Sequence, residues 1–288
     1  MATDSNSIYF YNPSLAASII FTVVYFGPSI YHLYALVFAP LHGKFQRSGH
    51  FTPLLIGAFL EVFGYGIRCA SLKQPDSIPL YAVSATLIVI APVFVCASLY
   101  LLMDRLIWTG NDEKSSERST KFLFINIRRR WLPRIFVTLD IISCLTQASG
   151  SGIAASGDWE GSAKDTGNGV LIGGLVLQVV TFSAFLIIVG SFHIKSKNAG
   201  KTIDQGVGKL LKGIYISGIF ILVRCIYRVI EFALGVDAYL FTHEWPLYVL
   251  EAVPMLIAIS VLGWYHPGRF LCRPGTPHSQ RSSQSANC

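Results

Sequence analysis

Residues 219–236 read IFILVRCIYRVIEFALGV, an apolar run that nevertheless carries Arg224, Arg228 and Glu231. In a helix, Arg224 and Glu231 lie seven residues apart on one face, and Arg228 is a direct neighbour of Glu231. A charge in lipid hydrocarbon is costly unless it is paired or turned toward the protein interior. The stretch therefore predicts a transmembrane helix whose charged face packs against other helices.

The composition indicates a membrane protein. Of the 288 residues, 52% are hydrophobic and only 14% are charged, whereas soluble domains carry about 25% charged residues. The net charge of +7 comes from basic residues between apolar runs rather than from one basic face, which argues against a nucleic-acid partner. The six Cys residues form no CxxC pair and show no metal-like spacing, so no cofactor is expected.

Seven apolar runs reach the roughly 20 residues that a transmembrane helix needs. They cover residues 14–38, 52–71, 80–103, 132–154, 169–192, 210–234 and 244–265. The predicted fold is therefore an all-α membrane protein, a seven-transmembrane-helix bundle over residues 1–268. The tail 269–288 is rich in Ser, Pro and Gln and is expected to be disordered.

The distribution of lysine and arginine predicts the orientation in the membrane. An odd number of spans puts the two termini on opposite sides. One set of loops carries sixteen Lys and Arg residues, whereas the set that includes the N-terminal tail carries only Lys73 and Lys164. Because positively charged loops stay in the cytosol, the N-terminus is predicted outside and the C-terminal tail cytosolic. The plasma membrane is the expected location, with the vacuole or another endomembrane as the alternative.

Polar side chains recur inside or at the mouth of four of the predicted spans. A spacing of seven places the members of each set on one helix face, which must turn away from lipid. The candidates are Glu61 and Arg68 in 52–71, Asp140 and Gln147 in 132–154, Arg224, Arg228 and Glu231 in 210–234, and Glu244 and Glu251 in 244–265. Two interpretations stay open: ion pairs that lock the bundle, or a polar cavity that binds an amphiphile by its head group.

The histidines do not converge on one predicted site. His243 and His266 lie at opposite membrane faces, so no His cluster can gather around a metal ion. His32 and His193 lie near the ends of predicted spans and are expected to be interface residues. The chain is therefore not expected to be an enzyme.

Four long motifs resemble one family of fungal membrane proteins. They are EVFGYGIR (61–68), LDIISCLTQASGSGI (139–153), RCIYRVIEFALGVDAYLFTHEWPLYVLEAVPML (224–256) and WYHPG (264–268). Together they resemble the lipid-translocating exporter family, the aminocholesterol-resistance (RTA-like) proteins, and the resemblance runs over nearly the whole chain. One departure is QASGSG (147–152), where the family often has three consecutive glycines after the glutamine.

The resemblance implies a fungal seven-span translocator or exporter. Relatives are associated with export of sphingoid bases and other lipids, with resistance to sterol-like or toxic amphiphiles, and in some cases with porphyrin transport. The implied partner is a membrane lipid or an amphiphilic small molecule. Glu231, Glu251 and Glu244 would attract a cationic amine head group. The arginines at 68, 224 and 228 would hold those acids ionised or bind a phosphate.

A seven-span lipid-sensing receptor without transport activity is the alternative. The segment MDRL (103–106) is similar to the Asp-Arg-Tyr switch of G-protein-coupled receptors. The last span has no Asn-Pro-x-x-Tyr motif, and the sixth has no Cys-Trp-x-Pro motif. The chain also lacks the phosphate-binding loop GxxxxGK[ST], so active transport would need an ion gradient or a partner protein.

Overall fold

The structure is a computed structural model that describes residues 13–42, 49–74, 77–110, 131–156, 161–198, 205–235 and 238–270. Every regular element in these ranges is a helix. The long helices are α1 (Leu15–Leu33), α3 (Thr52–Lys73), α4 (Ile78–Gly110), α5 (Leu132–Ser156), α6 (Gly161–Asn198), α7 (Gln205–Leu234) and α9 (Val253–Trp264). The short ones are η1 (Tyr34–Phe38), α2 (Ala39–Leu41), η2 (Gly49–Phe51), α8 (Tyr239–Thr242), η5 (Leu247–Ala252) and α10 (Pro267–Phe270).

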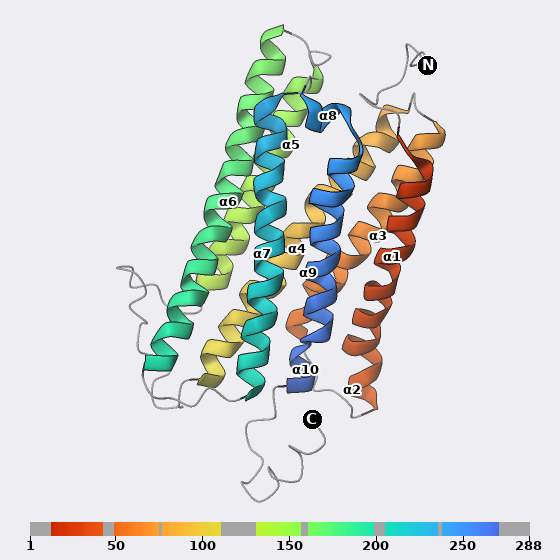
Figure 1. Cartoon of the computed structure of the whole chain (residues 1–288). Coiled ribbons are helices and arrows are strands. Elements are labelled where there is room, and N and C mark those ends of the chain that lie inside the picture. The colour runs from red at the N-terminus through yellow and green to blue at the C-terminus, as the bar shows by residue number, and fades with distance from the viewer. Residues whose placement is uncertain are drawn as a thin grey trace, which may run out of the picture.

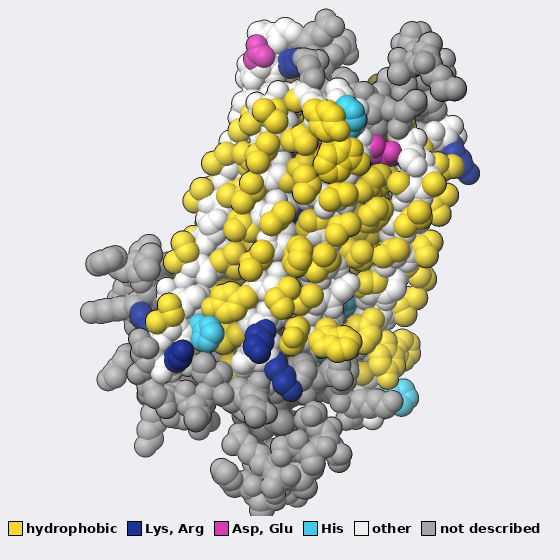
Figure 2. Space-filling model, in the orientation of Figure 1, with side chains coloured by type: hydrophobic (Ala, Val, Ile, Leu, Met, Phe, Trp, Pro, Cys, Tyr) yellow, Lys and Arg dark blue, Asp and Glu magenta, His cyan; other side chains and the backbone are white. Residues whose placement is uncertain are grey.

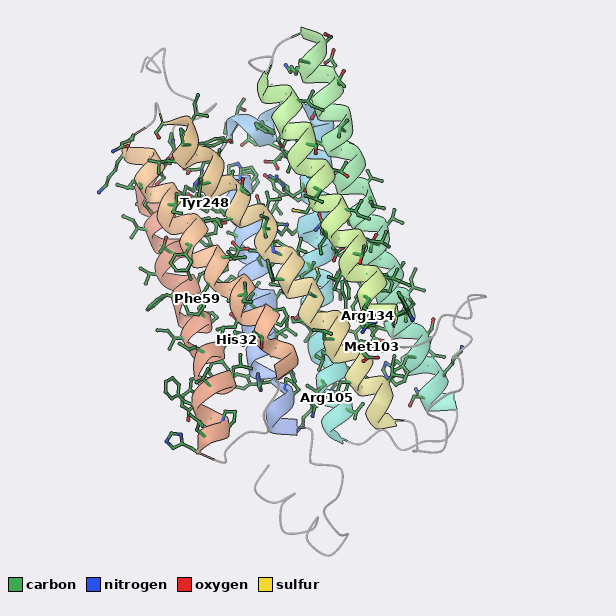
Figure 3. All side chains as sticks on the ribbon, turned by 180° about the vertical axis from the view of Figure 1, so that it is seen from behind. His32, Phe59, Met103, Arg105, Arg134 and Tyr248 are labelled. Atoms are coloured by element: carbon green, nitrogen blue, oxygen red, sulfur yellow. The ribbon has the colours of Figure 1, made fainter. Side chains whose placement is uncertain are left out.

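The long helices form one bundle of roughly parallel and antiparallel rods (Figure 1). Helices α1 and α3 lie on one side, α5 and α6 lie on the other, and α7 and α9 stand between them. Helix α4 crosses the bundle diagonally and connects the two sides, as the views in Figures 1 and 3 both show. We call the two ends of the bundle the α8 end and the α10 end.

A helix occupies each of the seven predicted spans, but the span count is only partly supported. Six helical stretches in the described part of the chain are long and apolar enough to cross a membrane: Leu15–Leu41, Thr52–Lys73, Ile78–Ile107, Gly161–Lys197, Gly206–Leu234 and Leu247–Trp264. The predicted span 132–154 is helix α5, which is not among these six because polar and small residues interrupt its apolar sequence. Residues 271–288 of the predicted tail lie outside the described residues.

Helix α6 is longer than the apolar run that predicted it. It has 38 residues, which corresponds to about 57 Å, whereas the hydrocarbon core of a bilayer is about 30 Å thick. The additional residues 161–168 are mostly polar or small, so hydropathy alone could not assign them to the helix. The α5–α6 pair consequently extends beyond the other helices at the α8 end (Figure 1).

The lateral surface of the bundle is apolar (Figure 2). Helix α1 exposes Ile20 and Val23, which are 58% and 66% accessible, and other helices expose similar side chains. Exposed aromatic residues lie at both ends of this surface: Tyr239 and Trp245 at the α8 end, and Trp131 and Trp264 at the α10 end. An apolar band between aromatic girdles is typical of a protein that sits in a bilayer. The protein is therefore an integral multi-pass membrane protein.

Glycines allow α5 and α6 to pack in direct backbone contact. A Cβ atom on Gly167 would lie 2.5 Å from the amide nitrogen of Ala154 and 2.6 Å from the carbonyl oxygen of Gly150. A Cβ atom on Gly150 would lie 2.6 Å from the carbonyl oxygen of Gly167. The two glycines therefore face each other, as small residues do where membrane helices approach closely.

We predict that Gly167→Ala destabilises the α5–α6 pair by about 1–3 kcal/mol, because the added methyl group has no space and the helices must separate. Gly169→Ala is the matched control, since nothing lies within 4 Å of a Cβ atom there. Thermal unfolding of the purified protein in detergent measures the difference. Equal midpoints for the two variants would contradict the tight packing.

Candidate functional site

The sequence 219–236 places its charges as helical spacing predicts. In α7, Ile219, Val223 and Ile226 are exposed on the lipid-facing surface, whereas Arg224 and Glu231 are at most 5% accessible. The apolar and charged residues thus occupy opposite faces of one helix. The charged face is turned to α4, η5 and α9, so the charges lie in the interior of the bundle.

Four charged residues form a buried ion-pair network, which we call the Arg224 cluster: Arg224, Arg228, Glu231 and Glu251. Arg224 Nη2 lies 2.7 Å from Glu251 Oε1. Arg228 Nη1 lies 3.0 Å from Glu231 Oε2 and 3.7 Å from Glu251 Oε2. Within this network two guanidinium groups face two carboxylates, which neutralises the charges in a region of low dielectric.

A proline in α4 provides the second acceptor for Arg224. Pro92 lies inside α4 and has no N–H group, so the carbonyl of Ile88, four residues earlier, loses its helical donor. Arg224 Nη2 donates to this Ile88 oxygen at 3.2 Å. The proline therefore leaves a free backbone acceptor next to the Arg224 guanidinium. Arg224 in α7 thus contacts both α4 and η5.

Glu251 lies in a π-helical turn. The segment η5 (Leu247–Ala252) is a π-helix that precedes Pro254 and continues into α9. A wider turn relieves the clash between the proline ring and the carbonyl four residues earlier. Tyr25 in α1 donates to the Ala252 carbonyl at 2.7 Å, which anchors this turn to α1.

A second polar network lies toward the α8 end, and we call it the Glu244 cluster: Ser14, Ser18, Arg68, Glu244 and Tyr248. Arg68 Nη2 lies 3.5 Å from Glu244 Oε1, and the Ser14 amide donates to Glu244 Oε2 at 2.6 Å. The Tyr248 hydroxyl donates to Glu244 Oε1 at 3.0 Å and lies 2.9 Å from Ser18 Oγ. This cluster ties α1, α3 and the start of η5 together, and Figure 3 shows Tyr248 toward this end.

Asp140 and Gln147 lie on the opposite side of the bundle and join other partners. Asp140 accepts a hydrogen bond of 2.8 Å from Tyr100 in α4. Gln147 donates to Ser143 and to Gln178 of α6, both at 3.1 Å. Neither residue forms an ion pair with the Arg224 cluster in the described part of the chain. The structure therefore divides the nine predicted site residues into separate groups.

Glu61 is the one predicted site residue whose carboxylate has no hydrogen-bond or ion-pair partner among the described residues. It is only 1% accessible, and both of its oxygens are buried. The hydroxyl of Tyr65, one turn further along α3, is also buried without a partner in the described structure. Glu61 lies between Gly57 and Gly64 on the face of α3 that packs against α4 at Ile88, whose carbonyl Arg224 contacts, so Glu61 borders the Arg224 cluster without belonging to it.

The expectation that His32 is an interface residue is wrong. His32 is 2% accessible, and its Nε2 lies 3.0 Å from the Ile259 carbonyl of α9. It continues a buried polar stripe on α1 that also contains Ser18, Tyr25 and Ser29. The spacing of these four residues follows one helix face, so the stripe was visible in the sequence. No group of three or more His, Cys, Asp or Glu residues in the described ranges could hold a metal ion.

The fold and the site define a helical membrane protein with an apolar coat and a paired, charged interior. Comparison with known families identifies it further, because the family model described as RTA1 like protein matches residues 54–273. The chain therefore belongs to the RTA1-like family, which confirms the resemblance found in the sequence motifs. No solved structure matches the chain.

Several curated proteins of Saccharomyces cerevisiae are similar to the chain. Protein RTA1 is 25% identical over 91% of the chain and 85% of its own length. Protoporphyrin uptake protein 1 is 27% identical over 89% of the chain and 91% of its own length. The sphingoid long-chain base transporter RSB1 is 28% identical over 73% of the chain and 62% of its own length. Protein RTM1 is 31% identical, and the match covers 65% of its length.

We predict that Arg224→Ala destabilises the protein by about 3–5 kcal/mol, because it leaves Glu251 buried with only the longer contact to Arg228. Arg134→Ala is the matched control: Arg134 is exposed on α5, and its loss should change stability by no more than about 0.5 kcal/mol. Thermal unfolding in detergent compares the two variants.

The double variant Arg224→Met/Glu251→Leu distinguishes a lost ion pair from lost packing. Removing both charges should recover much of the stability that Arg224→Ala loses, because no buried charge is left unpaired. A double variant as unstable as Arg224→Ala would show that the ion pair is not the cause.

Proposed function

We propose that this protein moves amphiphilic molecules with a charged head group, such as sphingoid bases or sterol-like toxic compounds, across a membrane and so gives resistance to them. The observation that carries the proposal is the charged interior of a bundle whose outer surface is apolar. The apolar outer surface can contact the hydrocarbon chain of an amphiphile, and the charged interior can contact its head group. Buried ionisable residues in membrane helices commonly line substrate or ion pathways.

The relatives support this class of function. One relative is named as a sphingoid long-chain base transporter, and another as a protoporphyrin uptake protein. Both names refer to molecules that combine a large apolar body with charged groups. We extend this substrate class, and no individual substrate, to the present chain.

We propose seven spans, in which α5 is added to the six apolar stretches. In the proposed orientation the α8 end lies outside and the α10 end lies in the cytosol. Among the described residues, Lys73 and Lys164 lie at the α8 end, whereas Lys195, Lys197 and Lys209 lie at the α10 end. This asymmetry follows the positive-inside rule. We place the protein in the plasma membrane.

The proposed polar path consists of Glu61, Arg68, Arg224, Arg228, Glu231, Glu244 and Glu251. Asp140 and Gln147, which bond to α4 and α6, form a second proposed polar group beside it. A head group can enter the Arg224 cluster only by replacing one of its ion pairs. The contact between Arg228 and Glu251, at 3.7 Å, is the longest in the cluster, and Arg228 is its most accessible member at 16% of the side chain. We therefore place the entry point at Arg228, where an amine would compete for the acids and a phosphate for the guanidinium.

We predict that purified protein in lipid vesicles moves a fluorescent sphingoid base between leaflets, and that Arg228→Ala slows this movement about tenfold or more, equivalent to about 1.4 kcal/mol. A membrane-impermeant quencher measures the fraction of label in the outer leaflet. Arg134→Ala, which removes an exposed arginine, is the matched control. Empty vesicles give the background rate.

The same experiment decides between two classes of protein. Wild-type movement no faster than in empty vesicles would contradict a translocator and favour the lipid-sensing receptor. Movement by Arg228→Ala at the wild-type rate would leave the translocator intact but reject the proposed entry point.

A further inference from the structure

We propose that Glu61 is a proton-exchange site: it is a neutral carboxylic acid in this conformation and releases its proton when the cationic head group of an amphiphile binds against it. This inference rests on the proposed translocation and names the ion that would be exchanged for the substrate.

The charge balance around the three buried arginines leaves Glu61 in excess. Arg68 is paired with Glu244, while Arg224 and Arg228 share Glu251 and Glu231. Three guanidinium groups thus face three carboxylates without Glu61. An additional buried carboxylate that no donor contacts would cost several kcal/mol to keep ionised, so the neutral acid is the stable form here.

None of the groups around Glu61 bonds to it in the described structure, although the Tyr65 hydroxyl and Arg224 Nε are buried donors that make no hydrogen bond there. Tyr25 from α1, Tyr65 from α3, Arg224 from α7 and Glu251 from η5 are the titratable and charged groups that act on it. The hydroxyl of Tyr25 is engaged with the Ala252 carbonyl, and Arg224 Nη2 is engaged with Ile88 and Glu251.

Helix α4 closes the other side of α3 with apolar contacts. Cβ atoms on Gly57 and Gly64 would lie 2.9 Å from the carbonyl oxygen of Ala91 and 2.7 Å from Cγ1 of Ile88. Glu61 lies between these two glycines in the sequence of α3. The close approach of α4 therefore brings backbone and aliphatic groups, which cannot neutralise a carboxylate.

A column of aromatic rings connects the level of Glu61 to the Glu244 cluster. The Tyr65 ring lies 5.5 Å from that of Tyr25 and 6.3 Å from that of Tyr248. The Tyr248 hydroxyl in turn contacts Glu244 at 3.0 Å. Phenol hydroxyls can both donate and accept hydrogen bonds, but the Tyr65 hydroxyl makes none among the described residues, so the column marks the direction of the α8 end and is not a continuous hydrogen-bonded chain in this conformation.

The exchange is balanced in atoms and charge. The O–H bond of the Glu61 acid breaks, its proton leaves to water at the α8 end, and the carboxylate forms an ion pair with the cationic head group. One positive charge enters the site as one leaves, so the interior keeps its net charge. No covalent bond to the amphiphile forms, and no oxidant or reductant is needed.

Proton release on binding of a fixed-charge amphiphile tests the proposal directly. Dodecyltrimethylammonium, a single-chain quaternary ammonium, has no proton of its own to release. We expect wild-type protein in weakly buffered detergent solution to release about one proton per chain on binding, as one carboxyl group allows, and Glu61→Gln to release none. A pH-indicator dye measures the release. Asp165→Asn, which removes an exposed acid at the start of α6, is the control and should match the wild type.

Infrared difference spectroscopy provides a second readout of the same carboxyl group. When the probe binds to the wild type, the band of a protonated carboxylic acid should be lost. The difference spectrum of Glu61→Gln should show no such loss. If Glu61→Gln does not fold, the affinities of the wild type and of Asp140→Asn are measured instead, since displacement of one proton from Glu61 makes binding to both about tenfold tighter per pH unit. An affinity that does not change with pH would overturn the proposal.

Other results separate this inference from the proposed function. Proton release that persists in Glu61→Gln but is lost in Asp140→Asn would overturn the proposal, because the exchanging acid would then be Asp140. Lipid movement by the wild type without any proton release would overturn the exchange at Glu61 and leave the translocator intact. Failure of the wild type to move lipid in vesicles would instead reject the proposed function.

Discussion

Neutralisation of charge in a medium of low dielectric is the constraint on which the interior of this protein depends. The ion pair of 2.7 Å between Arg224 and Glu251 neutralises both charges and joins α7 to η5. Pro92 leaves the Ile88 carbonyl without its helical donor, and this carbonyl accepts a second hydrogen bond from the Arg224 guanidinium. Three helical segments are thus fixed to one another at one point. The crossing of α4 and the π-helical turn that carries Glu251 are both consistent with this requirement.

The polar interior is organised in levels rather than as one cluster. The Glu244 cluster lies toward the α8 end, the Arg224 cluster lies deeper, and the aromatic rings of Tyr25, Tyr65 and Tyr248 connect the two levels. The α5–α6 pair carries its own polar contacts and packs through glycines. Among the predicted site residues in the described part of the chain, Glu61 is the one whose two carboxylate oxygens are both buried without a hydrogen-bond partner.

The sequence predicted where the helices lie and which face of α7 is charged, because both depend on local periodicity. It could not predict the partners. Arg68 and Glu61 share a face of α3 but are separated by about 10 Å along its axis, and Arg68 instead pairs with Glu244, far along the chain. The polar extension of α6 was missed because hydropathy does not detect a helix that is stabilised by glycine packing. The role of His32 was missed because its partner is a backbone carbonyl of another helix.

Photo-crosslinking with a long-chain amine tests most directly whether head groups enter this interior. The amine carries a photoactivatable group next to its nitrogen, and mass spectrometry of the labelled protein identifies the modified residues. Our account predicts labels on the buried faces of α3, α7 and η5, near Glu61 and Arg228, which an excess of unlabelled amine suppresses. Labels confined to exposed residues such as Ile20 and Val23 of α1, with none in the interior, would contradict it.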